Sequence, residues 1–502
     1  MTKTMHMRNL CLKLAKSNRA DEVKDILIKE GYWDDERYWR DYGDIANNFQ
    51  TIGGQQSSAL RAQIEKTQNM GDSILISKVI EDGIDPNNKD EAPSSVKEAM
   101  EKYLGVPNGD IFQLDEKQAN KLADKCGGMV VTGDDINPTY ALFDFGEGQE
   151  PENFPTTFCG ISQSNKLNMF FVQGKYCAGG TGALRFVKDG IQLIISRRSP
   201  KLNEANASND IGFTVTRKFP AGDSRRNTPF KYLVIDSKIP SFPAEPLKIL
   251  PKLNTTNPFE REWEYGAFIK LYDFDIGSTI RSKGNLDLSR RLSVMVPNPV
   301  FPLRIYERRK VKANTPQTTM SGLQYRLEDD RAENVEEDSP FGIEFTVDKQ
   351  VFKGEIYVLK SSIKKSQLRR WHGEHGLLYI VNGQVNGFQR NSIYRRQSVG
   401  LNYIADKVIT MIDCSQMDAD HHCDFFMSDR ERVSDSPFNK QVEKEIEFQL
   451  KNHEGLKRIQ EKHRSEFVKN ELADNQTLNK IMEKLLKNSP TLKNIFITGQ
   501  KI

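Results

Sequence analysis

A glycine-rich stretch from Tyr140 to Phe186 constrains the fold of this 502-residue chain more than any other part of its sequence. It begins with the apolar run Tyr140–Phe143, which predicts a buried strand, and Asp144 stands directly at the end of that run. The glycines that follow are Gly146, Gly148, Gly174, Gly179, Gly180 and Gly182. Glycine permits sharp turns and lets backbone N–H groups converge on an anion. The stretch therefore predicts an acid-bearing turn and then a phosphate-binding loop, as in a nucleotide site; the alternative is a set of ordinary turns.

Upstream, residues 57–80 predict a helix with three polar side chains on one face. Glu65, Asn69 and Asp72 are spaced by four and three residues, which places them together on a helix. A glutamate there could take a proton from water, and an asparagine carbonyl could bind Mg²⁺. The alternative is an ordinary amphipathic helix with a solvated polar face. Its apolar face would consist of Leu60, Ile64, Ile74 and Ile76.

The order of these features resembles the GHKL, or Bergerat-fold, ATPases: E-x-x-x-N-x-x-D on a helix, D-x-G-x-G after a strand, and then a glycine loop. This family includes the type II topoisomerase ATPase subunits, mismatch-repair MutL, the ninety-kilodalton heat-shock chaperones and the histidine kinases. The resemblance covers Ser57 to Lys270 and, more loosely, the domain after it. It implies a Bergerat-type α+β sandwich, with helices on a mixed, mostly antiparallel sheet, that binds ATP and Mg²⁺.

The resemblance also assigns roles to individual residues. It implies that Glu65 is the general base, that Asn69 holds Mg²⁺, and that Asp144 recognises the adenine amino group. Asp72 corresponds to an acid that the family often has at the end of this helix. The glycines that the resemblance assigns to the nucleotide are Gly146 and Gly148 beside the base, and Gly180 and Gly182 in a phosphate lid.

Two lysines are close enough in sequence to the glycine loop to neutralise phosphate charge. Lys175 stands inside the loop. Lys166 follows Ser164 and Asn165 in a polar segment that either reaches phosphate or metal or is an ordinary loop. The remaining members of the candidate phosphate-binding set are Gly174, Gly179 and Thr181.

The chain departs from the family pattern at one position. GHKL proteins often place a threonine after a glycine on a late strand, where it contacts the network at the adenine end. The corresponding pair here is Gly266-Ala267, and alanine has no hydroxyl. Either Thr214 or Thr216 substitutes for that threonine, or the contact is missing.

The pattern after the glycine loop predicts strands, at 184–187, 191–196, 212–217, 232–236 and 266–272. Helices followed by a mixed antiparallel sheet indicate an α+β fold rather than a doubly wound one. The predicted segments are a helical N-terminal lead-in over 1–56, an ATPase domain over 57–280, a charged linker over 281–340, a smaller α+β transducer-like domain over 341–435 and a helical C-terminal tail over 436–502. Aromatic residues Tyr32, Trp33, Tyr38 and Trp39 are expected to pack on the ATPase core; the alternative is an arm that crosses to a partner subunit.

Strands of the second domain are expected at 341–347, 354–359, 376–381 and 408–413. Residues Leu377–Asn386 resemble the strand-and-turn VNGR segment of the MutL and topoisomerase transducer domain. In those relatives a later loop sends a cation to the γ-phosphate, which implies Arg430 or Arg432 here; the alternative is a solvated helix cap. Groups around His372 and His421 contain metal-ligand residue types but no standard zinc spacing, which favours polar loops without metal.

Composition narrows the class of protein further. Charged residues make up 28% of the chain, no apolar run is long enough to span a bilayer, and the N-terminus has no secretory signal pattern. The formal net charge of +3 gives no global basic footprint for nucleic acid. The six cysteines form no C-x-x-C pair, which is typical of reduced thiols in a cytoplasm.

The expected activity is Mg²⁺-dependent ATP hydrolysis that drives a conformational clamp or switch, with a lid that orders around the γ-phosphate. By family resemblance, ATP binding would favour a homodimer, and a protein partner or DNA would be involved, in a bacterial DNA transaction or, by analogy alone, an anti-phage system. The alternative is a nucleotide-binding scaffold with little or no turnover. A histidine kinase is disfavoured, because His6 is the only histidine before Glu65 and the sequence contains no membrane sensor.

Overall fold

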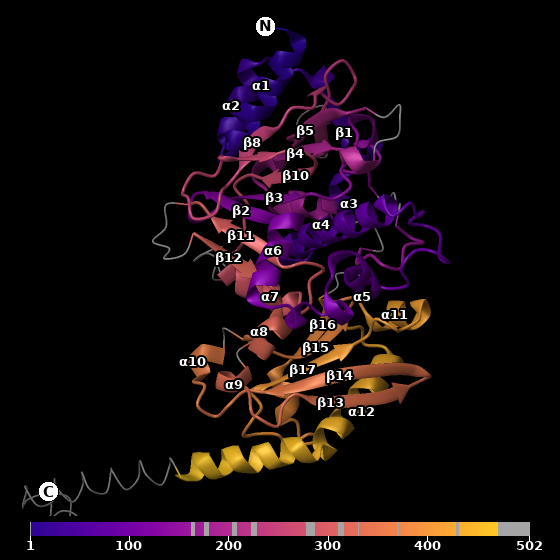
Figure 1. Cartoon of the computed structure of the whole chain (residues 1–502), viewed down its shortest axis with the longest axis vertical. Helices are drawn as coiled ribbons and strands as arrows, with labels where there is room; N and C mark the ends of the chain where they lie inside the picture. Colours follow the sequence, from indigo (N-terminus) through magenta and orange to yellow (C-terminus); the bar gives the residue numbers. More distant parts are fainter. Residues whose placement is uncertain are drawn as a thin grey trace, which may run out of the picture. The chain divides into compact units, whose positions relative to one another are not determined.

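The computed structural model describes residues 2–161, 166–174, 180–202, 208–221, 228–277, 287–309, 316–329, 331–368, 371–427 and 431–469. The chain forms two compact units (Figure 1). The first contains Met1–Asp330, Ile380–Gly387 and Phe426–Val433, and the second contains Arg331–Tyr379, Phe388–Phe425 and Ser434–Ile502. Both units combine helices with a sheet, so the α+β class predicted from the sequence is confirmed.

The described residues of the first unit form a ten-stranded sheet of order β1-β6-β5-β4-β10-β3-β2-β11-β12, with β7 paired to β5. The strands are β1 Trp39–Asp41, β2 Gly127–Gly133, β3 Pro138–Asp144, β4 Gln192–Arg197, β5 Asp210–Lys218, β6 Phe230–Leu233, β7 Ser241–Pro243, β10 Gly266–Leu271, β11 Leu303–Glu307 and β12 Gln317–Met320. β8 (Leu247–Leu250) and β9 (Arg261–Trp263) form a separate pair. Because β11 pairs in parallel with β2 while the central pairs are antiparallel, the sheet is mixed.

Two predictions along this part of the chain are wrong. The charged linker expected over 281–340 contains β11 and β12, which belong to the sheet. Charged residues of this segment are paired inside the fold instead of being solvated: Arg304 donates to Asn120 and contacts Asp124, and Glu307 pairs with Arg309 at 2.8 Å. The strand expected over 184–187 is instead mostly the 3₁₀ helix η7 (Gly180–Phe186), because a short apolar run is compatible with either structure.

The first unit is built around a long helix. Its helices include α1 Lys3–Lys16, α2 Ala20–Lys29, α3 Phe49–Gly54, α4 Ala59–Glu81, α5 Val96–Ala99, α6 Glu116–Cys126, α7 Ser289–Met295 and α8 Leu323–Asp329 (Figure 1). α4 begins at the N-cap Ser58, whose hydroxyl accepts a hydrogen bond from the Arg61 N–H at 3.2 Å. Its polar residues Arg61, Gln63, Glu65, Lys66, Gln68 and Asp72 are buried. The alternative of a solvated polar face on this helix is therefore wrong.

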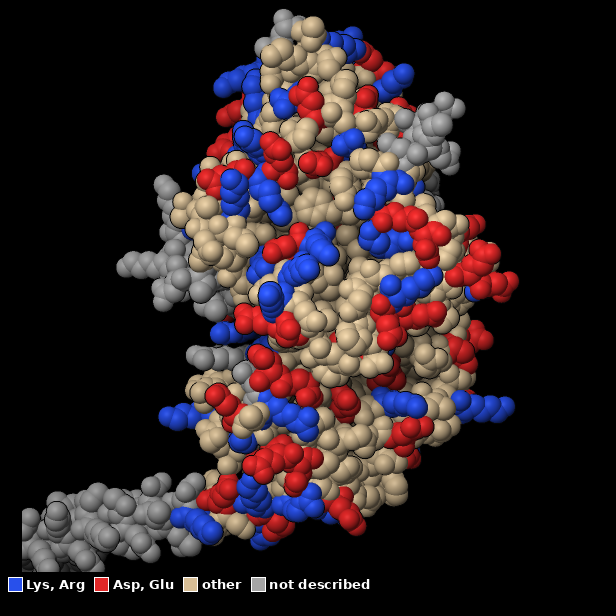
Figure 2. Space-filling view, in the orientation of Figure 1, with Lys and Arg blue, Asp and Glu red and all other residues tan. Residues whose placement is uncertain are grey.

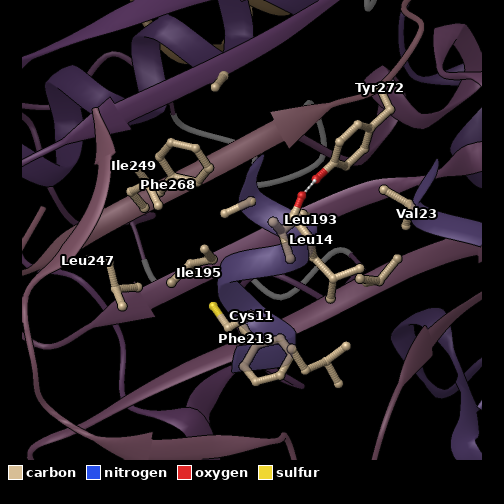
Figure 3. Packing of buried hydrophobic residues seen from close by; sticks show 14 of the residues in the cluster. Cys11, Leu14, Val23, Leu193, Ile195, Phe213, Leu247, Ile249, Phe268 and Tyr272 are labelled. Carbon is tan, nitrogen blue, oxygen red and sulfur yellow. Dashed lines mark hydrogen bonds between the residues drawn. The ribbon is translucent and has the colours of Figure 1, made fainter. Parts of the chain in front are cut away.

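The N-terminal helices complete the core of the same unit. Figure 3 shows Cys11 and Leu14 of α1 among residues of the sheet, including Leu193, Phe213 and Phe268. The Tyr272 hydroxyl donates to the Leu14 carbonyl at 2.7 Å (Figure 3). The four aromatic residues of the lead-in also pack on this core: Tyr32, Trp33, Tyr38 and Trp39. Residues 1–56 are thus an integral part of the first unit.

A second sheet, most of whose residues belong to the second unit, has five described strands in the order β13-β14-β17-β15-β16. They are β13 Phe341–Val347, β14 Gln350–Val358, β15 His375–Val381, β16 Gln384–Arg390 and β17 Val408–Asp413. Three of the four strands predicted for this region lie within these ranges, and the one predicted over 354–359 matches β14 except at its last residue. The helices include α9 Arg331–Asn334, α10 Lys365–Leu368, α11 Ala419–Phe425 and α12 Pro437–Asn452, and residues 454–469 are also helical.

The surface carries both signs of charge. On the face shown in Figure 2, Lys and Arg are interspersed with Asp and Glu, in keeping with the small net charge of the chain. Among the helices that the described residues form, none combines the length and the apolar character that crossing a bilayer requires.

Candidate nucleotide site

A cavity of about 460 Å³ lies in the first unit. The residues of the sequence motifs that line it are Glu65, Asn69, Asp144, Gly148, Lys166, Gly174, Gly180 and Thr181. They come from the helix α4, from the end of β3 and the turn after it, from Lys166, and from the two described ends of the glycine loop. The fold therefore brings three motifs that are far apart in the sequence to the walls of one cavity.

Helix α4 supplies one wall. Glu65 is only 4% exposed, and Asn69 follows it one turn later on the same side of the helix. A Cβ atom built on Gly180 would lie 3.3 Å from Asn69 Nδ2, and one built on Gly174 would lie 3.7 Å from Asn69 Oδ1. Both described ends of the glycine loop thus approach the amide of Asn69.

Asp144 supplies a carboxylate at the end of β3. Its Oδ1 accepts hydrogen bonds from the Gly146 N–H at 2.9 Å and from the Ser73 hydroxyl at 3.3 Å. Burial raises the pKa of Asp144 to about 7, although these hydrogen bonds oppose the shift. The carboxyl group therefore exchanges its proton near neutral pH.

The glycines after Asp144 permit a close packing of this turn. A Cβ on Gly146 would lie 2.2 Å from Ser73 Oγ, so Gly146 lets the turn touch α4. Gly148 has a φ of +60°, and a Cβ there would lie 1.9 Å from the Arg197 carbonyl oxygen. Of these two glycines, only Gly148 lines the cavity, whereas Gly146 lets the turn pack against helix α4.

Ala267 occupies the position where the family pattern expects threonine. It pairs with Asp144 across the ladder between β10 and β3, and it lines the cavity. Thr214 and Thr216 do not replace it, since both hydroxyls are used inside the sheet. Thr214 donates to the Leu233 carbonyl at 2.8 Å, and Thr216 donates to the Gly190 carbonyl at 2.7 Å.

Asp72 does not line the cavity, contrary to its assignment to the nucleotide. Its fully buried carboxylate accepts from the Gln173 N–H at 2.7 Å and the Gly174 N–H at 3.0 Å. Lys166 Nζ, which belongs to the cavity wall, lies 2.9 Å from Asp72 Oδ2. Asp72 thus contacts the segment that forms the wall rather than the cavity itself.

Several polar residues of the cavity wall were missed by sequence reasoning, among them Lys66, Ser73, Glu147 and Arg198. Burial lowers the pKa of Lys66 to about 8, and the neighbouring Glu65 opposes this shift. Arg198 donates to Glu147 at 2.9 Å. Burial raises the pKa of Glu147, while the charge of Arg198 opposes the shift. Ser73 could have been found, because it continues the four-residue spacing of Glu65 and Asn69.

The remaining candidates do not reach the cavity or fall outside the described residues. Gly182 does not line it, and a Cβ on Gly182 would lie 2.4 Å from Gln56 Cγ. Arg432 is exposed and is not among the residues of the cavity wall. The candidates outside the described residues are Ser164, Asn165, Lys175, Gly179 and Arg430.

The two histidine groups of the second unit make ordinary polar contacts. His421 Nδ1 lies 2.8 Å from Asp418 Oδ1, and Nε2 lies 3.1 Å from Asp348 Oδ2. His372 Nε2 lies 3.1 Å from the Asp406 carbonyl. Within the ranges that the structure describes, no cluster of three or more His, Cys, Asp or Glu residues could by itself hold a metal ion.

The cavity wall contains both apolar and polar residues. Its apolar lining includes Met70, Ile76, Leu142 and Ile269, while its polar residues include Glu65, Asn69 and Lys166. Such a lining suits a ligand in which a flat apolar ring is joined to a polyanion. The ring would carry a hydrogen-bond donor for Asp144. The sequence matches no protein-family model and no curated protein.

Proposed function

We propose that the first unit is a Bergerat-type ATPase domain, which binds ATP with Mg²⁺ in this cavity and hydrolyses it. One observation supports the proposal above all. The sequence pattern and the family resemblance together nominated residues on a helix, after a strand and in or near a glycine loop, and eight of those residues line a single cavity of about 460 Å³. Scattered polar residues on an unrelated fold would have no reason to converge in this way.

The adenine ring lies against the apolar lining, with its amino group donating to the Asp144 carboxylate. Asp144 suits this role because its Oδ1 is already oriented by Gly146 and Ser73. The carboxyl group must be ionised to accept from an amino group without donating itself, so base recognition strengthens as pH rises through about 7.

The phosphates lie toward Asn69, Lys166 and the described ends of the glycine loop. Lysine neutralises phosphate charge, and the N–H groups of a glycine loop donate to phosphate oxygens. Glu65 is placed on the same side of α4 as Asn69, where it orients the attacking water and accepts its proton.

The residues present fit Mg²⁺ bound mainly through the substrate. Mg²⁺ commonly takes one or two protein oxygens and completes its shell with phosphates and water, and the Asn69 carbonyl is such an oxygen. When bound, the ion would neutralise charge on the phosphates.

A second candidate function is a nucleotide-binding scaffold with little or no turnover. Ala267 favours it, because the cavity lacks the hydroxyl that the family pattern places at the adenine end. The buried Glu65 favours hydrolysis instead, since a scaffold has no need of a carboxylate beside the phosphates.

Mg²⁺-dependent ATP hydrolysis by the wild type and by Glu65→Ala, with ATP binding measured in parallel, separates these functions. The ATPase proposal expects turnover by the wild type and binding without turnover by the variant. Binding by both proteins with turnover by neither, even when DNA is added, favours the scaffold. Binding by neither protein contradicts both functions.

A further inference from the structure

Asp72 is buried behind one wall of the cavity. Its side chain has no exposed surface, and three hydrogen-bond donors contact its two carboxylate oxygens. Oδ1 accepts from the Gln173 N–H at 2.7 Å. Oδ2 accepts from the Gly174 N–H at 3.0 Å and from Lys166 Nζ at 2.9 Å. Asp72 therefore fastens both ends of the segment 166–174 to helix α4.

That segment contributes three residues to the cavity wall: Lys166, Met169 and Gly174. The backbone of Gly174 lies against α4, since an added Cβ would be 2.9 Å from Asp72 Oδ2 and 3.7 Å from Asn69 Oδ1. The position of Gly174 relative to Asn69 is consequently fixed through Asp72. Lys166 Nζ is held at the same wall by the same carboxylate.

We propose that Asp72 is a positioning residue, which sets Lys166 and Gly174 against the phosphate end of the cavity without itself contacting the nucleotide or its metal ion. This inference rests on the proposed function, because it assigns the phosphates to that end. It differs from the role implied by family resemblance, in which Asp72 is one of the residues that hold the nucleotide.

Only a carboxylate can satisfy this arrangement. A carboxylate offers two acceptor oxygens, whereas an amide of the same shape offers one oxygen and replaces the other by an NH₂ donor. In Asp72→Asn, that NH₂ group would face a backbone N–H or the Lys166 ammonium. At least one of the three hydrogen bonds must therefore break, although the volume of the side chain is unchanged.

Hydrogen exchange of the ligand-free protein tests the anchor independently of any nucleotide. We expect the Gln173 and Gly174 amides to exchange at least about tenfold faster in Asp72→Asn than in the wild type, with α6 and β13 unchanged. Asp82→Asn, an exposed substitution at the C-cap of the same helix, should leave these two amides unaffected. Unchanged exchange at Gln173 and Gly174 in Asp72→Asn would overturn the inference.

Affinities for ATP and for adenosine, each with Mg²⁺ and with EDTA, test the consequence for the site. Loss of a negative charge would by itself tighten the binding of an anion. We nevertheless expect Asp72→Asn to weaken ATP binding about tenfold, with or without Mg²⁺, and adenosine binding less than about twofold. In a Lys166→Met background the further loss caused by Asp72→Asn should be smaller, because the lysine to be positioned is gone.

The other outcomes contradict the inference in distinct ways. If Asp72→Asn binds ATP as tightly as the wild type does, Asp72 does not position Lys166 and Gly174 for ATP binding. A loss that disappears in EDTA means that Asp72 acts on the metal ion. If Asp72→Asn loses affinity for ATP and for adenosine equally, Asp72 has a general structural role. If the wild type binds neither ligand, the proposed function fails, and the exchange experiment alone decides whether Asp72 anchors the segment.

Discussion

The Ser73 hydroxyl lies 3.3 Å from Asp144 Oδ1, and this contact joins helix α4 to the end of strand β3. Ser73 is also the acceptor for the Glu147 N–H at 3.1 Å, so one hydroxyl fixes both the acid and the turn that follows it. Asp144 is thereby held in a buried position that costs stability whenever the carboxyl group is ionised.

Asp144→Asn should stabilise the first unit and weaken ATP binding. Because burial raises the pKa of Asp144 from 3.8 to about 7, ionisation destabilises the fold. This destabilisation is absent below the pKa that Asp144 has in the unfolded chain, and it is complete above pH 7. The free energy of unfolding of the variant should therefore exceed that of the wild type by about 2–4 kcal/mol at pH 8 and by little at pH 4. Thermal unfolding at the two pH values measures the gain, and a variant less stable than the wild type at pH 8 contradicts this prediction.

Ala267→Thr should tighten ATP binding, because it adds a hydroxyl beside Asp144 at the end of the cavity where we propose that adenine binds. A single hydrogen bond of about 1 kcal/mol corresponds to about fivefold in affinity. Ala267→Val is the matched control, since valine has the shape of threonine without the hydroxyl. Equal affinities for the two variants would show that the hydroxyl makes no contact with the ligand.

Gly148→Ala should unfold at a lower temperature and lose ATP binding. The residue has a φ of +60°, and its Cβ would lie 1.9 Å from the Arg197 carbonyl oxygen, so the turn must shift at a cost of about 3 kcal/mol or more. Gly83→Ala is a useful comparison, because Gly83 has a φ of +79° with open space around it and should cost about 1 kcal/mol. Similar losses of stability in both variants would argue against the clash.

In the second unit, hydrogen bonds to the buried carboxylate of Glu336 should make stability depend on acid. His463 Nε2 and Lys462 Nζ each lie 2.7 Å from a carboxylate oxygen of Glu336. Burial raises the pKa of Glu336, but these hydrogen bonds outweigh burial and lower the pKa to about 2. The resulting stability is present above the ordinary pKa of 4.5 and is lost as pH falls toward 2.

Glu336→Gln should therefore cost about 3 kcal/mol at pH 7 and progressively less as pH falls toward 2. Denaturant unfolding followed at several pH values measures this difference. The exposed neighbour Glu337 provides a matched control, since Glu337→Gln should have little effect at any pH. A difference between Glu336→Gln and the wild type that does not shrink on acidification would contradict this role of the Glu336 carboxylate.

Local patterns were enough to predict several elements of the fold. The run Tyr140–Phe143 is apolar and bounded by turn residues, and it is part of β3 with Asp144 at its end. The helix expected over 57–80 corresponds to α4. It could be predicted because the N-cap residue and the spacing of apolar and polar side chains are local properties of the sequence. Four of the five strands in the sheet of β13 to β17 were predicted for the same reason, whereas β16 was not predicted.

Features that depend on distant partners could not be predicted. The burial of Lys66 and the strand at 303–307 follow from contacts with residues far away in the sequence, and charged residues in isolation indicate a solvated segment. The spacing of Asp72 gave its place on α4 correctly, but it could not show that the carboxylate turns to Gln173 and Gly174 instead of the cavity.

The most direct test of the central claim is a calorimetric titration of the wild type and of Ala267→Trp with ATP and Mg²⁺. Ala267 lines the cavity, so an indole ring there would fill its adenine end. The account predicts one equivalent of ATP bound by the wild type and none by the variant, while both unfold cooperatively on heating. The claim is contradicted if the wild type gives no binding heat, or if both proteins bind ATP with the same affinity.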